Sequence, residues 1–139
     1  MVAWNSSHLG IAHGFVTVNT LTQLYYMMAR LRPMDRRSTS SIMTHIVSKT
    51  FAGIAVLDFL HNGSIAFFKD QPASLAVKVM TGVGFGLASA ASDWIFGGCL
   101  VYDLVALAVG QKSDQSWSKL LGVYALGAAG IVTARNIAR

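Results

Sequence analysis

The stretch Ser74–Gly110, SLAVKVMTGVGFGLASAASDWIFGGCLVYDLVALAVG, decides the fold class of this chain. Its 37 residues include only three charged side chains, those of Lys78, Asp93 and Asp103. One straight helix of this length would extend about 55 Å, whereas the hydrocarbon layer of a membrane is about 30 Å thick. The stretch therefore predicts two apolar membrane helices that break at Ser92-Asp93-Trp94.

The composition of the whole chain also favours a membrane protein. Of its 139 residues, 53% are hydrophobic and 12% are charged, whereas soluble domains contain roughly 25% charged residues. Short polar segments separate five apolar blocks, a pattern typical of transmembrane helices. We therefore expect an all-α fold, a transmembrane helical bundle of four to five helices with small-residue packing faces. The blocks are Leu9–Ala29, Ile42–Phe68, Leu75–Ala91, Ile95–Gly110 and Leu120–Ala134.

Polar segments mark the ends of these helices. Pro33 ends the first helix, and the run Ser38–Ser41 offers an N-cap to the second. The segment Lys112–Lys119 is predicted to be a polar hairpin. We expect residues 1–37 to form an N-terminal interfacial or spanning helix and a basic loop, and residues 38–139 to form the transmembrane helical bundle.

The basic residues cluster beside the predicted helices. The net charge is +5, but no basic stripe interleaved with aromatic residues suggests nucleic acid as a partner. Five spans would place the first and last basic clusters on the same side of the membrane, as the positive-inside rule prefers. Four spans stay open, because almost no loop separates the third and fourth blocks. Clusters at these places indicate contact with phospholipid headgroups, and the residues are Arg30, Arg32, Arg36, Arg37 and Arg135.

Small residues recur at helical spacing in three blocks. A four-residue repeat of small side chains lets a second helix approach closely. Such faces indicate either a tightly packed bundle or docking on other membrane subunits of a large hetero-oligomeric complex. The predicted helix-packing residues are Gly82, Gly86 and Ala90, then Gly10 and Gly14, then Ala125 and Ala129.

The sequence contains few features of a catalytic site. Cys99 is the only cysteine, so the chain alone cannot form a disulfide or a cysteine-based metal centre. Motifs for a serine nucleophile, a phosphate loop or a zinc helix are absent. We expect no catalytic residue, no metal and no cofactor other than bound phospholipid.

Several polar side chains inside the apolar blocks still require an interpretation. His45 and His61 lie about 24 Å apart on one helix, so only His13 with His45, or a histidine of a partner, could hold a haem iron. Hydrogen-bonded histidines are the favoured interpretation. Asp58 is predicted to be buried in a salt bridge to a neighbouring subunit, because Lys49 is too distant along the helix to pair with it.

Three short segments occur in an order that suggests a family. They are Ser38-Thr39-Ser40-Ser41-Ile42 at the start of an apolar helix, Gly82-Val83-Gly84-Phe85-Gly86-Leu87 followed by Ser92, and Gly97-Gly98-Cys99. With them, residues 38–134 resemble the four-helix accessory subunit of mitochondrial complex I, which is related to channel subunits of the inner-membrane protein translocases. The resemblance implies a non-catalytic subunit that packs on a core membrane subunit and binds lipid such as cardiolipin.

A second resemblance competes with the first. Ser41, Ile42 and His45, together with Asp103, resemble elements of the cytochrome b membrane anchor of succinate dehydrogenase. That resemblance implies a quinone contact at Ser41 and His45.

Met1–Asn5 lack the features of a secretory signal and of a cleaved mitochondrial presequence, so an organellar address would be internal or already removed. We expect a multi-pass protein of the mitochondrial inner membrane that serves as a structural subunit of a respiratory-chain complex, with complex I favoured. The alternatives are a succinate dehydrogenase anchor, or a small membrane channel or ATP synthase membrane subunit. A channel would use Asp58 and Lys49 as pore-lining charges.

Overall fold

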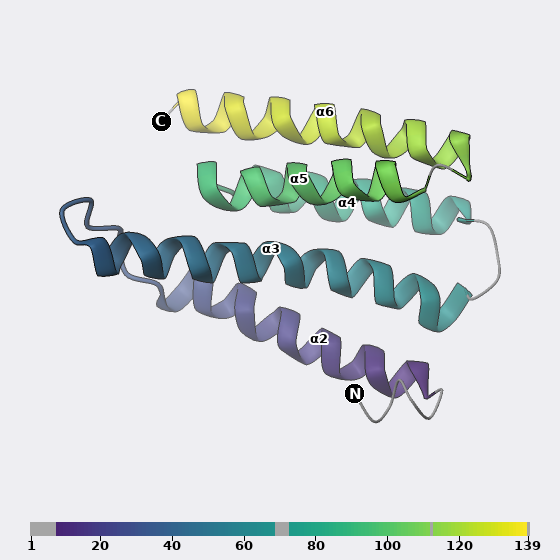
Figure 1. Cartoon of the computed structure of the whole chain (residues 1–139), viewed down its shortest axis with the longest axis horizontal. Helices are drawn as coiled ribbons and strands as arrows, with labels where there is room; N and C mark the ends of the chain where they lie inside the picture. The colour runs from purple at the N-terminus through teal and green to yellow at the C-terminus, as the bar shows by residue number, and fades with distance from the viewer. Residues whose placement is uncertain (1–7, 69–72, 112, 139) are drawn as a thin grey trace. The chain divides into compact units, whose positions relative to one another are not determined.

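The computed structural model describes residues 8–68, 73–111 and 113–138. These residues form α-helices and one π-helical turn, with no strand among them, which confirms the all-helical class (Figure 1). In chain order the elements are α2 (Leu9–Tyr25), η1 (Tyr26–Arg30), α3 (Thr39–Phe68), α4 (Leu75–Ala90), α5 (Trp94–Gly110) and α6 (Gln115–Ile137).

Two of the described helices, α3 and α6, are long and apolar enough to cross a membrane by length and composition. The helices α4 and α5 have 16 and 17 residues, so each rises only about 25 Å. Four or five helices were predicted to span, and two meet the length criterion. The break at Ser92-Asp93 leaves α4 and α5 short, and the α-helical part of the first block, α2, has only 17 residues.

The chain forms two compact units, residues 1–70 and residues 71–139. We call them unit 1 and unit 2. The sequence-based division lies instead between residues 37 and 38. The structure groups α2 with α3 because these helices pack along each other as an antiparallel hairpin (Figure 1).

Small residues and one buried hydroxyl hold unit 1 together. The side chains of Ala12, Ala52 and Ala55 are buried, so the two helices approach closely. The hydroxyl of Thr20 is within hydrogen-bond distance of the Ala55 carbonyl oxygen across the helix pair, at 2.8 Å.

In unit 2, α6 packs against both α4 and α5. Its inward face consists of Trp117, Leu121, Ala125, Ala128 and Val132, all buried.

Two glycines permit this packing. A Cβ atom at Gly97 would lie 2.6 Å from the Cγ atoms of Val132, and one at Gly82 would lie 2.7 Å from the Tyr124 ring. At both positions a side chain would force the facing residue to shift.

Polar caps define the helix starts of unit 2. The side chains of Ser74, Asp93 and Asp114 each accept a hydrogen bond from a backbone N–H in the first turn of α4, α5 and α6. The cap by Asp93 confirms the predicted break. The predicted hairpin over Lys112–Lys119 is wrong within its described residues, because Asp114 caps a helix that already begins at Gln115; Lys112 lies outside the described residues.

The contact at Gly97 predicts that Gly97→Ala lowers the free energy of unfolding by about 1–3 kcal/mol, the usual cost of overpacking. The buried Val132 side chain cannot move aside without shifting α6. The matched control is Gly98→Ala, at an exposed position with no atom within 4 Å. Thermal unfolding of the detergent-solubilised chain measures both variants. Equal midpoints would contradict the close contact between α5 and α6.

Candidate functional site

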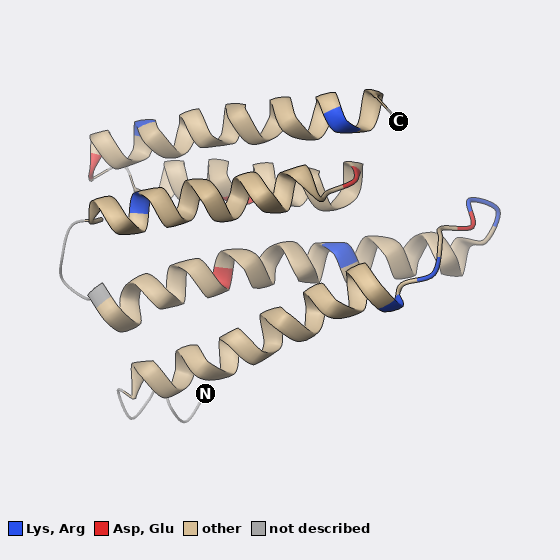
Figure 2. Cartoon of the chain, turned by 180° about the vertical axis from the view of Figure 1, so that it is seen from behind, with Lys and Arg blue, Asp and Glu red and all other residues tan. Residues whose placement is uncertain are grey.

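The segment between η1 and α3 carries the densest group of charges in unit 1. We call residues 31–38 the basic loop, and Arg30, the last residue of η1, directly precedes it. Figure 2 shows the basic residues gathered at this end of unit 1. The segment forms the link in the α2–α3 hairpin, so it lies where two antiparallel helices end together.

Hydrogen bonds fold the basic loop onto the first turns of α3. The Asp35 backbone N–H donates to Ser41 Oγ at 3.0 Å, and the Arg37 N–H donates to Asp35 Oδ1 at 2.9 Å. Ser38 accepts from the Ser41 N–H at 3.3 Å, which confirms the predicted N-cap.

His45 fixes the other end of the loop. Its Nε2 lies 2.9 Å from the carbonyl oxygen of Arg32. A carbonyl oxygen only accepts, so Nε2 is the donor in this bond. The His45 side chain is only 6% exposed. Ser41 and His45, the predicted quinone contacts, thus both bind the backbone of the basic loop.

The predicted lipid-binding arginines fall into two groups. The side chains of Arg30, Arg32, Arg36 and Arg37 are exposed, and none bonds to a described residue. Arg135 is different, since it is half-buried and its guanidinium donates to the carbonyl of Ala90 at the end of α4. That carbonyl belongs to the last turn of a helix, where acceptors lack helical partners.

The predicted helix-packing residues also divide. Gly82 lies against Tyr124, and Ala125 is buried in unit 2. A Cβ atom at Gly10, Gly14 or Gly86 would meet nothing within 4 Å. Ala90 is exposed and Ala129 is half-buried.

Sequence reasoning did not assign a packing role to Gly97 or Gly63. A Cβ atom at Gly63 would lie 2.9 Å from the His13 ring. The pair Gly97-Gly98 was visible in the sequence, but no pattern indicated which of the two faces α6.

The remaining polar candidates do not come together in unit 1. His13 packs against Phe59 and Phe67 near the end of α3, whereas His45 bonds to the basic loop near its start. His13 lies against Gly63, and the 18 residues from His45 to Gly63 extend about 27 Å along α3. The two histidines therefore do not lie side by side, as a haem held by both would require.

Asp58 is exposed on this chain, so its predicted salt bridge to a neighbouring subunit stays a prediction, while Lys49 is buried. Nine residues separate the two, and at 100° per residue they point to opposite sides of α3. Among the described residues, no group of three or more His, Cys, Asp or Glu side chains could hold a metal ion.

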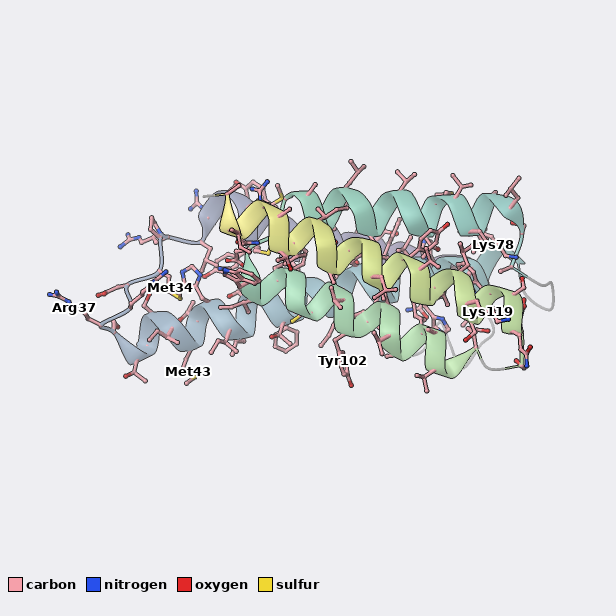
Figure 3. All side chains as sticks on the ribbon, turned by 90° about the horizontal axis from the view of Figure 1, so that it is seen from above. Met34, Arg37, Met43, Lys78, Tyr102 and Lys119 are labelled. Atoms are coloured by element: carbon pink, nitrogen blue, oxygen red, sulfur yellow. The ribbon has the colours of Figure 1, made fainter. Side chains whose placement is uncertain are left out.

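Large apolar side chains are exposed on every helix. Figure 3 shows Met43 of α3 and Tyr102 of α5 pointing away from the ribbons of their own units. Large exposed apolar patches on a protein surface are typical of sites that contact a membrane or another protein. The most exposed are Phe15, Val18, Met28 and Phe67 in unit 1, and Leu75, Leu87, Tyr102, Leu126 and Ile137 in unit 2, all at 65% or more.

A search of family models, curated proteins and solved structures found no match to this chain.

The bond between Asp35 and Ser41 predicts that Ser41→Ala loosens the basic loop. Loss of one hydrogen bond, worth about 0.5–1.5 kcal/mol, should speed tryptic cleavage after Arg36 and Arg37 by roughly two- to tenfold, because cleavage follows the open population. The matched control is Ser40→Ala, since the Ser40 side chain is exposed. Limited proteolysis of the solubilised chain, followed by mass spectrometry, gives both rates. Identical cleavage of the two variants would refute the role assigned to Ser41.

Proposed function

We propose that this chain is a small, non-catalytic structural subunit of a multi-subunit membrane complex. In this proposal the chain is a multi-pass protein of the mitochondrial inner membrane and belongs to a respiratory-chain complex, with complex I favoured. In this role α3 and α6 cross the bilayer, and the shorter α4 and α5 pack on α6 and on neighbouring subunits. The basic loop binds phospholipid headgroups.

The observation that carries the proposal is the exposure of large apolar side chains along all five helices. In water such surface is unfavourable by roughly 25 cal/mol per Å². Lipid chains or apolar subunits remove that cost. Among the described charged residues of unit 2, Lys78 and Lys119 lie near the starts of α4 and α6, Asp93 caps α5, and Arg135 lies in the last turn of α6. Asp103 is the exception, since it is buried in the middle of α5. Apart from Asp103, the surface between the helix ends suits apolar neighbours.

The hydrogen bonds of the polar residues support a structural role. Ser41 and His45 position a loop, Arg135 caps α4, and the hydroxyl of Tyr124 donates to the Lys78 carbonyl at 2.9 Å. Each of these bonds satisfies backbone groups at a helix end or between helices. Such contacts stabilise a bundle in surroundings that supply no water.

The choice of complex I rests on the resemblance of residues 38–134 to its four-helix accessory subunit. A succinate dehydrogenase anchor is the second candidate. The feature that favours it is the position of Ser41 and His45 one turn apart on α3, with His45 Nδ1 lacking a hydrogen-bond partner among the described residues. A channel that uses Lys49 and Asp58 gains no support, since these residues point to opposite sides of α3.

Native gel electrophoresis tests the proposal. The tagged full-length chain, extracted from its own membranes in a mild detergent, should migrate in a complex many times its own 14.9 kDa. Mass spectrometry of that band should find subunits of a respiratory complex, and their identity separates the two candidates. A harsher detergent that dissociates membrane complexes provides the control. Migration as a monomer or a small homo-oligomer in the mild detergent would overturn the structural-subunit role.

A further inference from the structure

We propose that Arg30 and Arg32 bind the phosphate of one anionic phospholipid, whose acyl chains lie along the exposed face of α2. Arg36 and Arg37 do not contribute to this site. The inference rests on the proposed function, because it requires unit 1 to lie in a membrane. It narrows the proposed lipid-binding site from the whole basic loop to Arg30 and Arg32.

The chain between the two arginines turns both of them outward. Leu31 is half-buried and has extended backbone angles, with φ −70° and ψ 117°, whereas its two neighbours are exposed. An extended pair of residues spans at most about 7 Å, so the long side chains of Arg30 and Arg32 can reach the same phosphate. Guanidinium groups bind phosphate oxygens through paired, charge-assisted hydrogen bonds. Neither side chain bonds to a described residue.

The backbone of this pair is held in place on both sides. The Leu31 N–H donates to the Tyr26 carbonyl at 2.8 Å, and the Arg32 carbonyl accepts from buried His45. The lipid therefore meets a backbone that is already ordered, and binding does not have to offset the entropy of fixing it.

The apolar side chains of α2 provide the place for the acyl chains. Val18, Leu21 and Tyr25 of α2 and Met28 of the η1 turn that continues it are each more than 60% exposed. They follow one another at three- or four-residue spacing, which puts them on one helix face. From Val18 to Met28 the helix rises about 15 Å, half of the roughly 30 Å hydrocarbon thickness. The length of this face therefore matches the hydrocarbon thickness of one leaflet. Tyrosine near its polar end is typical of the membrane interface.

The tip of the basic loop is a poorer site for the same phosphate. Asp35 lies in the same turn as Arg36 and Arg37 and accepts the Arg37 backbone N–H, so a carboxylate already opposes a bound anion there. The tip of the loop precedes Thr39, whereas the backbone of Arg32 lies beside His45, six positions further along α3 and about 9 Å lower. The tip is therefore separated from Arg32 by about the screening length of 8 Å at physiological salt. Figure 3 shows Arg37 at the far tip, pointing away from the helices.

Two double variants with the same change in charge test the assignment. The full-length chain in neutral detergent, at about 0.15 M salt, is titrated with phosphatidylglycerol, and native mass spectrometry counts the chains that retain one lipid. R30Q/R32Q should weaken binding about 30-fold, from the usual contribution of each arginine at a lipid surface. R36Q/R37Q should weaken it by less than about fivefold, because of screening. R30K/R32K, which keeps the charge but loses the paired guanidinium hydrogen bonds, should bind more weakly than the parent chain and more tightly than R30Q/R32Q.

The other outcomes overturn the proposal. Equal losses in the two glutamine variants would assign lipid binding to the net charge of the loop, and no loss in either would remove the site. Displacement of phosphatidylglycerol by inorganic phosphate at equal concentration would identify a free-anion site instead. If R30Q/R32Q lost helical content by circular dichroism, lipid binding would be measured on the single variants R30Q and R32Q instead. Each should bind the lipid about fivefold more weakly than the parent chain, and no loss in either would overturn the proposal. None of these results depends on how the chain migrates in a native gel.

Discussion

Close approach of helix backbones is the constraint on which both units depend. Between helices in an apolar medium the hydrophobic effect contributes little, so contact surface and hydrogen bonds must hold them together. Gly97 and Gly82 give that contact in unit 2, and Gly63 accommodates His13 in unit 1. The bonds from Thr20 to Ala55 and from Tyr124 to Lys78 then link helix to helix. Large side chains are left on the outside, where lipid or other subunits can cover them.

The sequence predicted the helices well because their ends carry local signals. Pro33, Ser38 and Asp93 act on residues within one turn, and the structure places helix boundaries beside all three. The start of the last helix was missed because Gln115–Lys119 is polar, although Asp114 is an ordinary N-cap. Polar first turns of apolar helices look like loops when only hydropathy is considered.

The faces of the helices could not be predicted equally well. Glycines at Gly82 and Gly86 have the same spacing, yet only Gly82 lies against a neighbouring ring. Helical rotation alone does not tell which side the partner occupies, since that depends on contacts distant in sequence. Asp58 was predicted to pair with a neighbouring subunit, and its side chain is exposed on this chain, where a partner can reach it.

Alkaline carbonate extraction tests whether these helices lie in a bilayer or in the core of a soluble protein. Membranes that contain the full-length chain are washed at high pH, which releases soluble and peripheral proteins but not integral ones. If the helices lie in a bilayer, the chain should stay in the membrane pellet with a known integral protein and enter the soluble fraction only after detergent is added. Release into the carbonate supernatant together with a peripheral marker would contradict the bilayer location.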